Sequence, residues 1–260
     1  MESKKKIILW GVGVVLVIVA SVCFAFAFGL FPVAKPSSNA VNLSSTSKEQ
    51  FSDVKETTLN LEDNPIDFKQ EMEKYPDMYA WLRVSGTDVD FPILQHPLDD
   101  NFYLDHNADG EPDDNGAIYT QMCNSKDMQD PVTVVYGHNM NLSGAMLNQL
   151  LLFEDKEFFD NNEYFEIYTP GHIYRYRIIS AYAADDRHIM NSFDFSNKTI
   201  RMQYFDSVCN PHSLESNVRD GATLNEDDKI VQISTCMGNV AQADERFILT
   251  GVLSETRLTK

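Results

Sequence analysis

Eight short apolar-rich runs, separated by turn residues, fill the sequence between residues 80 and 253. Runs of this length that contain β-branched and aromatic side chains predict strands, and Ser85-Gly86-Thr87 between the first two is a hairpin signal. Many short strands in one chain are typical of a closed or nearly closed barrel, because closure leaves no unpaired sheet edge. The runs cover residues 80–84, 88–94, 116–119, 132–138, 164–168, 173–183, 229–236 and 246–253. We therefore expect a mainly β fold built on eight strands.

Three other segments carry apolar side chains at helical spacing. Residues 65–75 follow Asn64, a candidate N-cap, and have Pro65 in the first turn. Residues 143–153 and 196–208 each begin at a serine that can cap a helix. We expect helices at all three places.

The N-terminal region differs in composition from the rest of the chain. Residues 7–31 are an uncharged run of 25 residues preceded by three lysines, which is long enough to cross a bilayer. We expect residues 1–6 to be a cytoplasmic tail, residues 7–31 a transmembrane anchor, residues 32–59 a stalk and residues 60–260 an extracellular catalytic domain. A cleaved signal peptide is the alternative, although its apolar core is shorter, about 7 to 15 residues.

The charge of the chain limits its partners. With 21 basic and 39 acidic residues the formal net charge is -18. A surface of this sign repels a phosphate backbone, so we expect no nucleic-acid partner.

The cysteines and histidines give little support to a metal site or a disulfide framework. Cys123, Cys209 and Cys236 have no close spacing and no C-x-x-C or H-E-x-x-H pattern. Residues 105–110 match the first six positions of a calcium-binding EF-hand loop, but position 12 is Gly116 in place of the required glutamate. An Asx-rich turn is therefore favoured over a calcium site, and we expect no cofactor.

Three residues with chemically reactive side chains lie at the ends of predicted strands. His138 follows an apolar strand, Cys236 ends another, and Arg246 opens the next. If the last two strands form a hairpin, Arg246 returns opposite Cys236, and strand periodicity puts the thiol on the same face as Gln232 and Ser234. A histidine and an arginine near a thiol supply the proton transfer and charge stabilisation that a cysteine nucleophile needs. Taken one by one, these residues also fit a buried inert thiol, a solvated histidine and an arginine paired with Glu245.

Residues 233–236, Ile-Ser-Thr-Cys, resemble the T-L-x-T-C motif of the sortases, the cysteine transpeptidases of Gram-positive bacteria. Arg246 has the expected place in the following strand, and residues 136–140 are similar to the class B pattern Y-G-H-N-M. The strand ending at Gln95, the Tyr103-Leu104 pair and a long helix-containing insertion between Ala183 and Lys229 are also similar to class B. Ile233, where leucine is common, and Asp99-Asp100-Asn101 depart from the pattern.

The resemblance implies an eight-stranded sortase β-barrel that cleaves a sorting signal of the Asn-Pro-x-Thr-x kind. Cys236 would attack the carbonyl after the threonine and form a thioacyl enzyme, His138 would protonate the leaving amine, and Arg246 would stabilise the oxyanion. Implied partners are surface proteins with a C-terminal sorting motif and an amine of peptidoglycan. Implied substrate contacts are Ser234, Thr235, Leu104 and Asn101.

Two alternatives remain at this stage. One is a pilin-polymerising sortase, against which stands the lack of an Asp-Pro-Trp or Asp-Pro-Phe segment before the barrel. The other is a non-catalytic, membrane-anchored binding module in which Cys236 is only a buried side chain. Alkylation of Cys236 in the folded protein would distinguish an enzyme from such a module.

Overall fold

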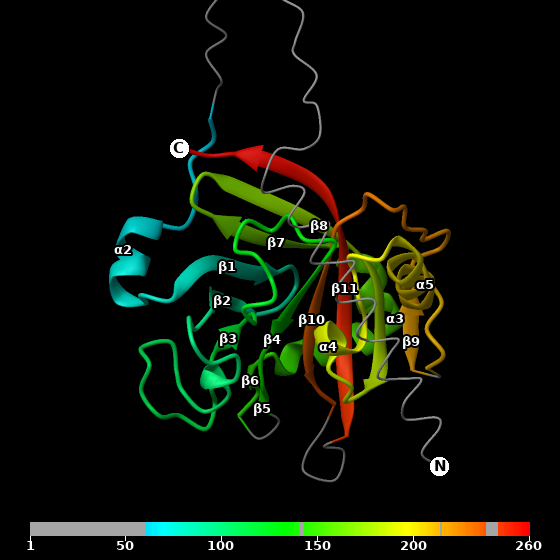
Figure 1. Ribbon diagram of the computed structural model, residues 1–260, viewed down its shortest axis with the longest axis horizontal. Helices are drawn as coiled ribbons and strands as arrows, with labels where there is room; N and C mark the ends of the chain where they lie inside the picture. Colours follow the sequence, from blue (N-terminus) through cyan, green and yellow to red (C-terminus); the bar gives the residue numbers. More distant parts are fainter. Residues whose placement is uncertain (1–60, 141–142, 214, 238–243) are drawn as a thin grey trace, which may run out of the picture. The chain divides into compact units, whose positions relative to one another are not determined.

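A closed ring of eight strands forms the body of the protein (Figure 1). The computed structural model describes residues 61–140, 143–213, 215–237 and 244–260. The strands follow the ring order β11-β10-β4-β3-β2-β1-β7-β8, and β8 pairs again with β11. Their bounds are β1 Met78–Val84, β2 Asp90–Leu94, β3 Ile118–Tyr119, β4 Val132–Tyr136, β7 Tyr164–Thr169, β8 His172–Asp185, β10 Ile230–Cys236 and β11 Glu245–Leu258. Each predicted run overlaps one of these strands, so the expected mainly β, eight-stranded barrel is confirmed.

Two of the ring's pairings are parallel, β4 with β10 and β2 with β3, and the others are antiparallel. The predicted hairpin between β1 and β2 is present, with Gly86 at a φ of 78°. A short ninth strand, β9 (Ser216–Val218), pairs with β8 outside the ring. The parallel β4–β10 pair matters most for the site, because parallel strands end at the same edge of a sheet.

Two apolar clusters lie on opposite faces of the β4–β10–β11 sheet. The inner cluster fills the barrel and includes Val231, Ile233, Phe247 and Leu249. The outer cluster packs alternate residues of the same strands against the insertion between β8 and β10. The insertion contains α4 (Ile189–Ser192) and α5 (Lys198–Cys209), and α5 lies on the flank of the barrel away from α2 (Figure 1). The predicted helix-containing insertion is therefore present.

The predicted helices are placed with mixed accuracy. The first is α2 (Phe68–Lys74), which is capped by Asp67. Asn64 has another role, because its Nδ2 donates to the carbonyl of Thr169 at 3.0 Å and ties this segment to the end of β7. The helix α5 begins at Lys198 and is capped by Asn197, one residue after the expected serine.

The helix predicted over residues 143–153 is wrong in its first half. A two-residue strand, β6 (Ala145–Met146), pairs there with β5 (Asn139–Met140), and a 3-10 helix, η2 (Asn148–Glu154), follows. The backbone N–H of Leu147 donates to the carbonyl of His138 at 2.9 Å, and Met146 has a φ of 56°. Both observations are incompatible with an α-helix through this position. Two further helices had no recognised sequence signal: α3 (Lys156–Asn161), capped by Asp155, and the 3-10 helix η1 (Phe102–Leu104).

The localisation expected from the sequence requires correction. A membrane span needs about 20 consecutive apolar residues in a helix. Within residues 61–260, as far as the structure describes them, no helix is long and apolar enough to cross a membrane. The predicted anchor, residues 7–31, lies outside the described residues, as do the predicted tail and stalk. The expected single-pass anchoring and extracellular location thus find no support in the described residues, and the domain boundaries stay predictions.

Candidate active site

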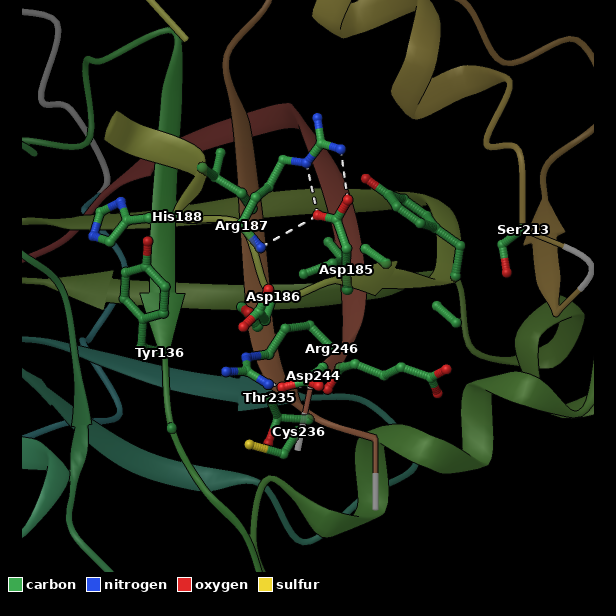
Figure 2. Close-up of a pocket in the computed structure, with 18 of the residues that line it drawn as sticks. Tyr136, Asp185, Asp186, Arg187, His188, Ser213, Thr235, Cys236, Asp244 and Arg246 are labelled. Atoms are coloured by element: carbon green, nitrogen blue, oxygen red, sulfur yellow. Dashed lines mark hydrogen bonds and ion pairs between the residues drawn. The ribbon is translucent and has the colours of Figure 1, made fainter. Parts of the chain in front are cut away.

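A cavity of about 810 Å³ opens where β4, β10 and β11 end, under the insertion (Figure 2). The barrel supplies one wall, and residues from the end of β8 through the segment after α5 supply the other. All seven residues that the sequence analysis selected border this one cavity: Asn101, Leu104, His138, Ser234, Thr235, Cys236 and Arg246. Residues from well-separated segments of the chain therefore meet at one place.

Cys236 and Arg246 form a direct cross-strand pair. The antiparallel register of β10 and β11 sets Cys236 opposite Arg246, as the hairpin hypothesis predicted. Figure 2 shows both side chains at the same end of the cavity, with the Cys236 thiol next to the arginine side chain. The thiol is half-buried, and Arg246 Nη1 donates to the backbone carbonyl of Glu245 at 3.1 Å. A nucleophile and a permanent cation thus lie side by side.

His138 reaches the same edge through the parallel pairing of β4 with β10. Tyr136 lies opposite Ser234, so His138 and Cys236 each lie two residues past a paired position. The backbone N–H of Gly137 donates to the carbonyl of Ser234 at 3.3 Å and continues the pairing toward the site. A side chain at Gly137 would collide with Ile118 and Leu147. The glycine before the histidine is therefore needed for close packing.

Two asparagines that the sequence analysis assigned no role connect the histidine segment to the cysteine. Asn139 Nδ2 donates to the backbone carbonyl of Cys236 at 2.8 Å. Asn148 Nδ2 in turn donates to Asn139 Oδ1 at 2.7 Å. Asn139 belongs to the Y-G-H-N-M pattern, so that motif contained the signal, whereas nothing in the sequence singled out Asn148. These bonds hold the end of β10 against the segment after β4.

The insertion contributes charged and aromatic residues that no motif indicated. Arg187 donates from Nε and Nη2 to the carboxylate of Asp185 at 2.6 and 2.5 Å, and these bonds lower the pKa of Asp185 (Figure 2). The ring of His188 lies 6.2 Å from that of Tyr136 on the barrel wall. Burial raises the pKa of Tyr136, whose hydroxyl has no hydrogen-bond partner among the described residues. The insertion therefore makes the second wall of the site polar.

A buried hydrogen-bond network lies behind the cavity on the same face as Cys236. Tyr204 of α5 donates to Gln232 Oε1, and Gln232 Nε2 donates to the hydroxyls of Tyr182 and Thr250 at 3.3 and 3.1 Å. Gln232 is fully buried, and these bonds satisfy its amide. The sequence placed Gln232 on this face, but only the structure reveals its partners. The network fixes α5 to β8, β10 and β11.

The four expected substrate contacts differ in exposure. Leu104 is 41% exposed, and Asn101, the residue before η1, is also exposed. Ser234 is 5% exposed and shares the face of Cys236 by strand alternation. Thr235 borders the cavity but alternates with Ser234, and its buried Oγ1 has no hydrogen-bond partner in the described part of the chain.

The other two described thiols do not border the cavity, and the acidic loop shows no metal-binding arrangement among the described residues. Cys123 is exposed, Cys209 is buried, and all three described cysteines are free. In the loop at residues 105–116, Asn107 Oδ1 accepts from the N–H of Asp109 at 3.0 Å, which is an Asx turn, and also from the N–H of Glu111 at 3.1 Å. Among the residues that can be described, no group of three or more His, Cys, Asp or Glu side chains is arranged to hold a metal ion.

Known proteins resemble the chain in both sequence and structure, although no family model matches it. A Listeria monocytogenes protein named sortase B is 28% identical over 197 residues, which are 75% of this chain and 78% of the relative. The crystal structure of Clostridium perfringens sortase B is 31% identical, with a TM-score of 0.64, and the match covers 72% of this chain and 99% of that one. A class B sortase from Streptococcus pyogenes, described as involved in pilus biogenesis, is 23% identical with a TM-score of 0.60 and covers 73% of this chain and 98% of its own. This last likeness concerns the fold alone.

Proposed function

The chain belongs to the class B sortases, which are cysteine transpeptidases, and from this premise we propose the reaction and the roles of its residues. The substrate is a surface protein with a C-terminal sorting signal of the Asn-Pro-x-Thr-x kind. The enzyme cleaves after the threonine and joins the new carboxyl end to an amine of peptidoglycan. The observation that carries the proposal is the cross-strand pair of Cys236 and Arg246 in a cavity that His138 also borders.

The first half-reaction forms the thioacyl enzyme. The thiolate of Cys236 attacks the threonine carbonyl carbon, so a carbon–sulfur bond forms while the carbonyl oxygen takes the negative charge. Arg246, opposite the cysteine, donates to this oxygen. The carbon–nitrogen bond then breaks, and His138 gives its proton to the departing amine.

The second half-reaction returns the enzyme to its starting state. An amine of peptidoglycan attacks the thioester carbon, the carbon–sulfur bond breaks, and the thiolate leaves. His138, now neutral, accepts the proton that the attacking amine loses. No oxidant, reductant or cofactor is required, because one amide bond is exchanged for another through a thioester and no atom changes its oxidation state.

Recognition of the sorting signal is assigned to the residues around the nucleophile. Ser234, on the same face as Cys236, and Leu104 and Asn101, at the mouth of the cavity, contact the residues before the scissile bond. The unpartnered hydroxyl of Thr235, which has no bond within the described part of the chain, is a further candidate contact. The insertion closes the opposite side and limits access of water to the thioester.

The test is acylation of the full chain by a panel of sorting peptides, followed by intact-mass analysis. We expect one thioacyl adduct with an Asn-Pro-x-Thr-x peptide, and no adduct with a peptide in which alanine replaces the threonine. Glycine oligomers and a diaminopimelate-containing stem peptide then serve as competing acceptor amines. Adduct formation without transfer to either amine, but with transfer to a lysine-containing pilin peptide, would contradict the proposed acceptor.

The exposed thiol provides a matched control. Cys123→Ala removes a cysteine that lies outside the cavity, and it should leave the adduct unchanged. Cys236→Ala should abolish it. An adduct that survives Cys236→Ala but is lost with Cys123→Ala would refute the assignment of the nucleophile.

A further inference from the structure

The imidazole of His138 is held by a backbone carbonyl from a different part of the chain. Its Nε2 lies 2.7 Å from the carbonyl oxygen of Leu104, the last residue of η1. A carbonyl only accepts, so Nε2 must carry the hydrogen of this bond. In the neutral ring, the bond therefore selects the tautomer with Nε2 protonated and the lone pair on Nδ1.

The carbonyl belongs to a firmly anchored turn. Tyr103 is 3% exposed, and its hydroxyl donates to Asp77 Oδ2 at 2.8 Å. Phe102 stacks between His96 and His106, with ring centroids 4.2 and 4.0 Å apart. Because the neighbouring side chains fix η1 on both sides, the Leu104 carbonyl presents a fixed acceptor to the histidine.

Gly116 occupies the point where the turn and the histidine meet. A Cβ atom at this position would lie 2.5 Å from the Tyr103 oxygen, 2.9 Å from the Leu104 oxygen and 3.0 Å from His138 Cδ2. The first two contacts are too short for any side chain and are made with backbone atoms, and the third is tight. The next residue, Ala117, donates its N–H to the Tyr103 carbonyl at 2.9 Å, so the segment cannot simply swing away.

From this geometry we propose that Gly116 and the Leu104 carbonyl position the catalytic histidine so that His138 Nδ1, and not Nε2, exchanges protons with the substrate. The proposal rests on the transpeptidase function given above. Gly116 is a positioning residue, because its lack of a side chain leaves room for the hydrogen bond between His138 and Leu104. The role of Leu104 thus extends beyond the substrate contact expected from the sequence.

Proton transfer balances with this assignment. In the imidazolium both nitrogens carry hydrogen, and Nδ1–H gives its proton to the departing amine while Nε2–H stays bonded to Leu104. The product is the neutral ring with its lone pair on Nδ1. That lone pair accepts the proton from the attacking amine in the second half-reaction, so the ring need not rotate or change tautomer between the two steps.

The test combines a spectroscopic signature with a rate. Two-bond proton–nitrogen spectra of the full chain labelled with 15N-histidine distinguish the two neutral tautomers, and His138→Gln identifies the His138 signals among the six histidines. We compare wild type, Gly116→Ala and Gly110→Ala. The control is closely matched, because Gly110 lies in the same loop with a φ of 82°, against 60° for Gly116, yet a Cβ there would meet nothing within 4 Å. Both variants place an alanine at positive φ, but only Gly116→Ala disturbs the Leu104 carbonyl.

The expected result has three parts. Wild type and Gly110→Ala show His138 protonated on Nε2, Gly116→Ala loses this tautomer preference, and its rate of acylation by a sorting peptide falls about 10²-fold, as misplacement of a catalytic group commonly produces. A wild-type His138 protonated on Nδ1 overturns the proposal. So does a Gly116→Ala protein that keeps both the tautomer and the rate.

Failure of this proposal can be distinguished from failure of the proposed function. The tautomer measurement needs no substrate, so it decides the role of the Leu104 carbonyl even if no sorting peptide acylates the enzyme. If Gly116→Ala does not melt cooperatively, the wild-type spectrum still decides which nitrogen carries the proton.

Discussion

Both faces of β10 are buried, but they have different functions. On the inward face, Val231 and Ile233 are 1% and 0% exposed and pack in the barrel interior. On the outward face, Gln232 and Ser234 are 0% and 5% exposed and lie under the insertion, followed by the half-buried Cys236. The inward face is covered by apolar side chains, whereas the outward face meets the wall of a cavity. Burial alone therefore does not identify the site; the cavity at the end of the outward face does.

This difference separates stability from chemistry along one strand. A large-to-small change on the inward face leaves a void in a close-packed interior and should lower stability. A change at the end of the outward face removes a reacting group that few neighbours depend on and should lower activity. Substitutions on the two faces of β10 should therefore give opposite balances of lost activity and lost stability.

The largest effect is expected at the outward end of the strand. Cys236→Ala should abolish acylation, because the nucleophile is gone, while the midpoint of thermal unfolding changes little. Rate measurement by intact mass and a thermal melt of the same sample check both statements. A large loss of thermal stability would mean that the outward face is also structural at its end.

Arg246→Lys should be nearly as harmful to acylation as Arg246→Ala, although it keeps the positive charge. The proposed role requires a planar donor reaching the substrate oxygen from the strand opposite Cys236, and a lysine lacks that fork. We expect a loss of about 10² to 10³ in rate, or about 3 to 4 kcal/mol in the activation barrier. Single-turnover acylation measures it. Near wild-type turnover of the lysine variant would show that Arg246 acts only through its positive charge or only as a structural residue.

Substitutions on the inward face should lower the stability of the protein and leave the acylation rate nearly unchanged. Ile233→Ala should lower the free energy of unfolding by about 2 to 5 kcal/mol, since Ile233 is fully buried in the barrel interior. Urea denaturation measures the loss, and acylation per folded molecule should stay close to that of wild type. If acylation instead falls with no loss of stability, the two faces are not separable in the way proposed.

The smallest effect is expected in the network behind the site. Tyr204→Phe removes the hydroxyl that donates to Gln232 Oε1, which should cost about 1 kcal/mol of stability at neutral pH. Burial raises the pKa of Tyr204 well above its ordinary value, so the unfolded chain loses this proton before the folded one does. Stability from this group is complete below about pH 10 and falls as the pH rises further.

The Phe variant should therefore lose stability less steeply than wild type above about pH 10. Urea denaturation at neutral pH and at successive alkaline values provides the comparison. Parallel losses in the two proteins would show that Tyr204 keeps its ordinary titration, and that the network is less buried than the structure indicates.

Local sequence patterns predicted much of the barrel and of the site. Strand runs are recognisable because each needs only its own apolar residues and turn signals, and all eight lie where expected. The pairing of Cys236 with Arg246 was predictable because an antiparallel hairpin relates residues that are close in sequence. Helix ends were less accurate, since Asp67 and Asn197 compete with neighbouring cap residues of similar propensity.

The errors occur where long-range contacts override local preference. The segment at residues 145–147 has a helical pattern, but its backbone pairs with β5 and with the carbonyl of His138, so its neighbours in space decide its conformation. The anchor expected at residues 7–31 is a separate case, because it lies outside the described residues, within which no helix is long and apolar enough to cross a membrane.

The amino-acid order alone was enough to identify the chemically reactive residues, because a thiol, an imidazole and a guanidinium are properties of single residues and their strands are encoded locally. Only the tertiary structure decided what surrounds them: the Leu104 carbonyl bonded to His138, the space at Gly116, the Asn139 bond to Cys236 and the cover supplied by the insertion. Each of these features brings together residues that are distant in the sequence. It depends on backbone atoms or, at Gly116, on the absence of a side chain. Such contacts depend on how the closed barrel brings distant segments to one edge, so a local pattern can mark a residue such as Asn139 but does not name its partner.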